Sequence, residues 1–181
     1  LEKSVITKLR ASAEQGKLPH ITEVQAQFIE LLDATGNVSR VSDLTSKVSG
    51  SATREEQARV AFIAQLSPKL AVISEDDNFY NSVAVKTVFD EKSLKSTVTS
   101  LIATIKEIGE PKSIKEIAKV AGIEDSAQAA ALASTSKLLA TLNGRWGLIK
   151  WPMVNPKNIR DKICVILRES GKQMHFNEIA A

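Results

Sequence analysis

One pattern occurs three times along the chain and constrains its fold more than any other feature. An apolar-periodic segment ends in a glycine, an apolar residue follows five positions later, and another follows three positions after that. Such a glycine is typical of a helix C-terminus, and a spacing of three indicates one face of a second helix. Each copy therefore predicts a helix, a glycine cap, a short connection and a second helix. The three sets are Gly36, Val41 and Leu44; Gly109, Ile114 and Ile117; Gly171, Phe176 and Ile179.

The first copy continues into a third helix and a hairpin. Thr53 and Glu56 have the spacing of a capping box. The helix that they open is expected to end near Pro68. Two β-rich runs around a polar turn then predict a hairpin within residues 70–85.

The second copy continues in the same way. Its third helix is expected to start at Asp125, capped together with Gln128, and to end at residues 143–144. A short aromatic segment, residues 144–152, is expected to form the wing. Three helices followed by a β-wing define a winged helix. The apolar positions assigned to this third helix are Ala129, Leu132, Leu139 and Leu142.

The predicted fold class is mainly α with small β-wings, built from tandem winged-helix domains. Residues 1–20 are interpreted as an N-terminal helix that ends an upstream domain. Residues 21–90 and 91–154 are the first and second winged helices. Residues 155–181 begin a third unit at Asn155-Pro156, a favourable helix start, and are expected to be truncated within its second helix.

Composition narrows the class of protein. One cysteine, Cys164, excludes an internal disulfide and favours a reducing, cytoplasmic setting; within its apolar run it is expected to be buried. No apolar run approaches the ~20 residues that span a bilayer, so no membrane partner is expected.

Residues 21–90 hold 6 basic and 10 acidic residues, whereas residues 91–154 hold 9 basic and 6 acidic residues and residues 155–181 hold 5 basic and 3 acidic residues. The second half therefore has a mild preference for a polyanion.

Signals for catalysis are weak. The two histidines, His20 and His175, are far apart in the sequence, and neither has a neighbouring set of metal ligands. No phosphate-binding loop or nucleophile elbow occurs. We therefore expect no enzyme activity, no cofactor, no metal and no small-molecule substrate.

Residues 140–181, about a quarter of the chain, resemble a known family. The segments that carry the resemblance are 146–156, beginning Trp-Gly-Leu, then 159–163 and 171–180. They resemble the HARE-type helix-turn-helix family, in the version found in bacterial proteins related to sigma factors. The Trp-Gly-Leu wing also resembles the folded domain of the RNA polymerase delta subunit, and residues 75–79 resemble the first wing of these proteins. The resemblance implies a role in transcription, on promoter DNA or on RNA polymerase.

The first hypothesis is a DNA-associated transcription protein that binds duplex DNA through third helices and wings. Of the seven polar positions considered on the third helix and wing of the second unit, only three carry positive charge, so weak, salt-sensitive binding is expected. Trp146 and Trp151 could stack on bases, but pinning the wing to the helices is the favoured interpretation. The alternative is a protein-interaction module that docks on RNA polymerase or another partner without DNA, which the acidic first unit supports. The candidate DNA contacts are Arg54, Gln57, Arg59, Gln128, Ser134, Lys137, Arg145, Lys150, Lys157 and Arg160.

Overall fold

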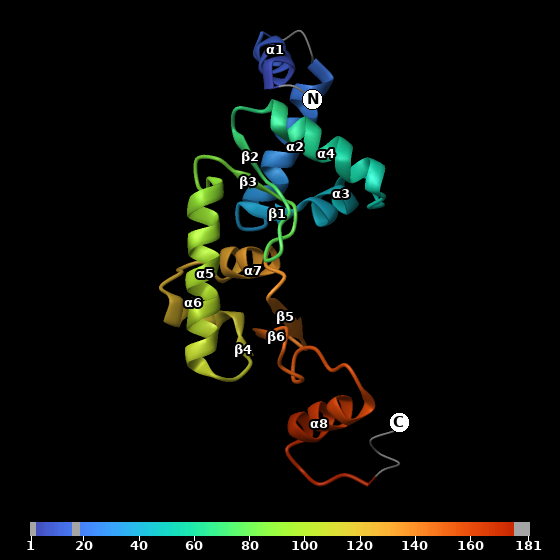
Figure 1. Cartoon of the computed structure of the whole chain (residues 1–181), viewed down its shortest axis with the longest axis vertical. Helices are drawn as coiled ribbons and strands as arrows, with labels where there is room; N and C mark the ends of the chain where they lie inside the picture. Colours follow the sequence, from blue (N-terminus) through green and yellow to red (C-terminus); the bar gives the residue numbers. More distant parts are fainter. Residues whose placement is uncertain (1–2, 16–18, 176–181) are drawn as a thin grey trace.

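The computed structural model describes residues 3–15 and 19–175 and shows an elongated molecule (Figure 1). Two units with the same order of elements follow one another. Unit 1 contains α2 (Pro19–Asp33), β1 (Val38–Arg40), α3 (Val41–Ser49), α4 (Arg54–Leu66), β2 (Leu70–Ile73) and β3 (Ser82–Val85). Unit 2 contains α5 (Glu91–Ile108), β4 (Lys112–Ser113), α6 (Ile114–Ala121), α7 (Ser126–Ser134), β5 (Leu139–Leu142) and β6 (Arg145–Leu148). The helices α1 (Lys3–Glu14) and α8 (Ile159–Ser170) flank the two units.

Each unit has one small antiparallel sheet, and the two sheets have the same topology. The strand order is β1-β3-β2 in unit 1 and β4-β6-β5 in unit 2. In unit 1, Val38 pairs with Ala84 and Leu70 with Val85. The expectation of a helix-rich chain with small β-hairpins is confirmed, including the hairpin within residues 70–85. The first strand of each sheet was not predicted, because β1 and β4 are only three and two residues long.

Side-chain and glycine caps set the ends of several helices. Thr53 accepts from the backbone N–H of Glu56, and the Glu56 carboxylate accepts from that of Thr53, which confirms the predicted capping box. Gly109 ends α5 with φ 76°, and Gly171 ends α8 with φ 64°. Asp125 caps α7 by accepting from the backbone N–H of Ala127 rather than by pairing with Gln128.

The predicted third helix of unit 2 was too long. α7 ends at Ser134, and Leu139 and Leu142, assigned to the helix by their spacing of three, lie in β5. Asn143 and Gly144 form the turn of the β5–β6 hairpin, with φ values of 50° and 75°. A type I′ turn requires positive φ at both central residues, and Asn-Gly is its commonest sequence. Residues 143–144 therefore join two strands.

One of the two hydrophobic clusters crosses the boundary between the units. A cluster inside unit 1 is built around Phe28, Leu32 and Leu44. The larger cluster combines residues of unit 2 with residues of unit 1, so the two units share a core. Its buried members from unit 1 are Val38, Ile73, Phe79, Ala84 and Phe89.

The two flanking helices lie at opposite ends of the described molecule (Figure 1). α1 contacts α4 and α2. α8 starts at Ile159, three residues later than the expected start at Asn155-Pro156, because Asn158 is its N-cap and accepts from the backbone N–H of Asp161. Cys164, expected to be buried, is exposed, because the helix turns Val165 inward instead. The predicted second helix of the third unit falls mostly outside the described residues.

Candidate nucleic-acid interface

The third helix of unit 2 is covered by unit 1. α7 packs against β1, and Ala127 is its one fully exposed residue. Gly36 lies so close to this helix that a Cβ atom there would stand 2.6 Å from Cα of Gln128. The Arg40 guanidinium donates a hydrogen bond to the carbonyl of Ser134. Gln128 and Ser134, both candidate DNA contacts, are therefore half-buried at the junction of the two units instead of on an open helix face.

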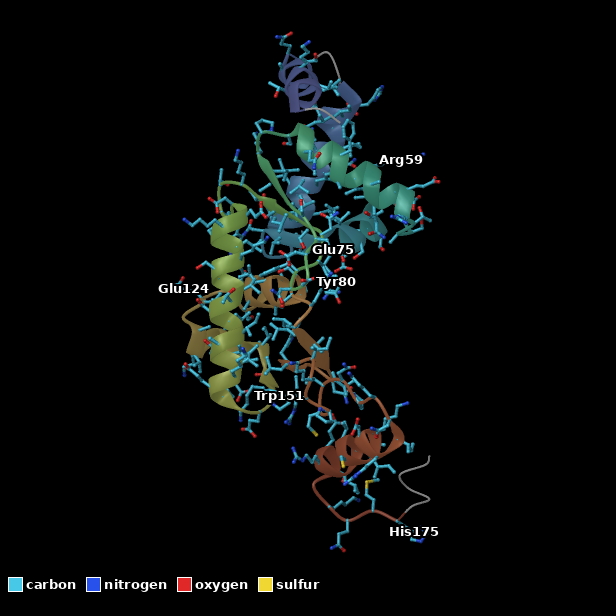
Figure 2. All side chains as sticks on the ribbon, viewed as in Figure 1. Arg59, Glu75, Tyr80, Glu124, Trp151 and His175 are labelled. Atoms are coloured by element: carbon cyan, nitrogen blue, oxygen red, sulfur yellow. The ribbon has the colours of Figure 1, made fainter. Side chains whose placement is uncertain are left out.

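The loop between β2 and β3, residues 74–81, is wing 1, and it also lies against unit 2. Its Tyr80 N–H donates to the carbonyl of Thr135 at 2.9 Å, and the Lys137 N–H donates to the carbonyl of Asn78 at 2.8 Å. Phe79 forms a β-bridge with Ser136 and is buried. Figure 2 shows Glu75 and Tyr80 of wing 1 beside α7. Wing 1 therefore serves as an internal contact.

Charged groups surround this contact. The Lys137 ammonium lies 2.7 Å from a carboxylate oxygen of Glu75 and 2.8 Å from the backbone carbonyl of Asp76. Lys137 and Arg40 also lie over the Tyr80 ring, at 5.5 Å and 4.1 Å from its centroid. Lys137 was predicted to lie on the third helix and to face phosphates. It instead follows that helix, and its ammonium is paired with Glu75 of wing 1.

Lys95 of α5 binds the same wing. Its ammonium lies 3.0 Å from a carboxylate oxygen of Asp76 and 3.0 Å from one of Glu91. The hydrogen bond from Lys95 lowers the pKa of Asp76, helped by the backbone N–H of Asn78. The hydrogen bonds that Lys95 donates to Asp76 and Glu91 raise the pKa of Lys95. Both partners are therefore charged at neutral pH.

The candidates of unit 1 lie on the open side of α4. Arg54 and Arg59 are exposed, and Figure 2 shows Arg59 at the outer edge of the molecule. Gln57 is half-buried, and its amide donates to the carbonyl of Ala52 at 2.7 Å. Glu55 and Glu56 lie between Arg54 and Arg59 in the sequence, so this surface has little net attraction for phosphate.

Positive charge gathers at the C-terminal end of the described molecule. We call residues 143–172 the basic tip; they comprise the turn of the β5–β6 hairpin, β6, the following loop and α8. The tip holds seven Lys and Arg residues against two carboxylates, Asp161 and Glu169, a net charge of 7 − 2 = +5. All seven cations are exposed: Arg145, Lys150, Lys157, Arg160, Lys162, Arg168 and Lys172.

Local contacts order part of the basic tip. The Asp161 carboxylate accepts from the Lys157 backbone N–H at 3.1 Å, and the Asn143 amide donates to Glu169 at 2.7 Å, which ties the hairpin turn to α8. Arg145 and Arg168 line one hollow of about 230 Å³ between the hairpin and α8.

Four sequence candidates are therefore brought together at the tip: Arg145, Lys150, Lys157 and Arg160. Sequence reasoning missed Lys162, Arg168 and Lys172. A charge count over a 30-residue window, instead of over whole predicted domains, would have found them.

The two tryptophans are structural. Trp146 and Trp151 both pack against the larger hydrophobic cluster, which confirms the expectation that they pin the wing to the helices. A Cβ atom at Gly147 would lie 2.7 Å from the Trp151 ring, so this ring fits directly over the β6 backbone.

Other kinds of site find little support among the described residues. In residues 3–15 and 19–175 no three His, Cys, Asp or Glu side chains converge in a way that could hold a metal ion. None of the helices in these ranges combines the length and apolar character needed to cross a membrane. Comparison with known proteins gives no match to a family model, a curated protein or a solved structure.

Proposed function

We propose that this chain is a DNA-associated protein of the transcription type, built from tandem winged helices, whose basic tip holds duplex DNA. The observation that carries the proposal is the gathering of seven exposed cations against two carboxylates in residues 143–172. The order helix, strand, helix, helix, strand, strand in both units is that of a winged helix, and supports the proposal. The sequence resemblance of residues 140–181 to a transcription-associated family points the same way.

The proposed contact is with phosphates rather than with base edges. Base reading by a winged helix uses the third helix in the major groove, and in unit 2 that helix is covered by unit 1. Lys and Arg side chains on an open surface instead neutralise phosphates, which gives affinity without sequence preference. The protein would then hold DNA at any sequence, and its position would be set by a partner.

Binding of the chain to labelled duplexes of two unrelated sequences tests the proposal. Fluorescence anisotropy across a salt series should give the same Kd for both duplexes at each salt concentration. The logarithm of the binding constant should fall with the logarithm of salt with a slope of roughly −4 to −6, because each neutralised phosphate contributes about −0.9. Absence of binding at low salt would overturn the proposal.

A second candidate function is docking on a protein partner, such as RNA polymerase, without DNA. The observation that favours it is the charge of unit 1, where residues 21–90 hold 6 basic and 10 acidic residues and the α3–α4 corner is open to solvent. An interaction with purified RNA polymerase that persists without nucleic acid would support this function. This second function also requires that the chain does not bind DNA duplexes of random sequence.

A further inference from the structure

The acidic wing 1 lies where nucleic acid would approach unit 2. In a winged helix, phosphates meet the residues around the third helix and the start of the wing. In unit 2 these positions include Lys137, just after α7, and Lys95 of α5 packs nearby. Glu75 and Asp76 of wing 1 hold both lysines. We propose that wing 1 occupies a phosphate-binding position on unit 2 and keeps this second basic site closed to nucleic acid; the inference rests on the proposed DNA-binding function.

The contacts have the chemistry of a bound phosphate. A phosphate offers anionic oxygens to a Lys ammonium at about 2.7–2.9 Å. The Lys137 ammonium donates to a carboxylate oxygen of Glu75 at 2.7 Å and to the carbonyl oxygen of Asp76 at 2.8 Å. The Lys95 ammonium donates to a carboxylate oxygen of Asp76 at 3.0 Å. Wing 1 thus presents oxygens to the same cations that a DNA backbone would need.

These ion pairs are not what holds the two units together. The side chains of Lys137 and Glu75 are 27% and 59% exposed, and those of Lys95 and Asp76 are 32% and 42% exposed. Ion pairs this open to water contribute little to stability. The apolar contacts of Val38, Ile73 and Phe79 bury surface at the same junction. Neutral wing side chains should therefore leave the junction in place, Lys137 without its carboxylate partner, and Lys95 with Glu91 alone.

The site would open by a local change, with the shared core intact. The C-terminal side of wing 1 is anchored to unit 2, because Phe79 is buried, the Tyr80 N–H donates to the carbonyl of Thr135, and the Asn78 carbonyl accepts from the Lys137 N–H. Residues 74–77, which precede this anchor, are exposed. Once their carboxylates are neutral, this exposed part can be displaced by a phosphate without exposing the core. The masked site would then add phosphate contacts to those of the basic tip.

The test compares two double variants that remove the same charge. Glu75→Gln/Asp76→Asn neutralises the two carboxylates on the lysines, and the amide oxygen introduced at position 76 can still accept from the N–H groups that Asp76 caps. Asp77→Asn/Glu55→Gln neutralises two exposed carboxylates of unit 1 as the control. Circular dichroism and thermal unfolding establish that both remain folded.

Anisotropy titrations of random duplex then measure the salt slope and the Kd. Relative to the control, Glu75→Gln/Asp76→Asn should steepen the slope by about two and tighten binding on the order of tenfold at low salt. Adding Lys95→Ala and Lys137→Ala to that variant should abolish the gain. Equal slopes and affinities in the two double variants would overturn the inference, even where the wild-type chain binds DNA. Binding by the wing variant alone, with none by the wild type, would support the masked site and reject the basic tip.

Discussion

Gly36 and Gln128 belong to different units, yet their backbones touch: a Cβ atom on Gly36 would lie 2.6 Å from Cα of Gln128 and 2.9 Å from its amide nitrogen. Real Cβ atoms do not approach a backbone this closely, so the junction of the two units requires glycine here. The φ of Gly36, +94°, adds a second reason. This contact places α7 against β1 and removes it from the open surface.

Gly36→Ala should therefore destabilise the fold far more than the same change at a glycine with open space around it. Gly122 is the matched control, because its φ is +72° and a Cβ there meets nothing within 4 Å. Gly122→Ala should cost about 1 kcal/mol for its left-handed backbone, whereas Gly36→Ala should cost roughly 2–4 kcal/mol because overpacking is added. Urea unfolding measures both; equal losses would show that the close approach does not matter.

Tyr80 should stabilise the junction through its ring. Arg40 and Lys137 both lie over this ring, and a cation–π contact contributes about 0.5–1 kcal/mol at a partly exposed site. Tyr80→Leu should lower the free energy of unfolding by about 1–2 kcal/mol, while Tyr80→Phe should stay close to wild type. Hydrogen exchange of the α7 amides should speed up in the Leu variant only. Equal effects of the two changes would point to the hydroxyl instead.

The ion pair between Asp76 and Lys95 should add a small, pH-dependent contribution to the stability of the fold. Because the folded-state pKa of Asp76 is lowered, its contribution is fully present above the unfolded pKa, about 4, and is lost as pH falls through the folded value. The raised pKa of Lys95 gives a contribution that is present below about pH 10 and lost as pH rises further.

The measurement is the difference in Tm between the wild type and Asp76→Asn across pH. The difference should be constant between about pH 5 and pH 9 and should shrink at both extremes. A difference that persists unchanged at pH 2 would show that the Asp76 charge is not involved. Asp77→Asn, a change in the same loop, should show no such dependence.

Local signals in the sequence predicted the local structure well. Thr53 with Glu56 opened a helix as expected, because a capping box involves only residues three apart. The hairpin within residues 70–85 followed from its polar turn. The spacing of three that placed Leu139 and Leu142 on a helix was misleading, since the Asn143-Gly144 turn makes this segment a strand.

The junction between the units could not be predicted in this way. Lys137 meets Glu75 across 62 positions of sequence, and no periodicity or cap connects residues so far apart. For this reason the sequence did not show that Gln128, Ser134 and Lys137, three of the candidate DNA contacts, lie at the junction of the two units. Arg145 and Lys150 are exposed, as expected, because within the described residues unit 1 covers the α7 side of unit 2 and not this end (Figure 1).

The most direct measurement compares the salt dependence of duplex binding in two fourfold variants. One removes charge from the basic tip: Arg145→Ala, Lys150→Ala, Lys157→Ala and Arg160→Ala. The control removes four exposed cations from unit 1: Lys47→Ala, Arg54→Ala, Arg59→Ala and Lys69→Ala.

If the tip holds DNA through phosphates, the tip variant should flatten the salt slope by roughly four and weaken binding equally at two unrelated sequences. The control variant should keep a slope close to that of the wild type. Equal losses in both variants, or an undiminished slope in the tip variant, would contradict the account.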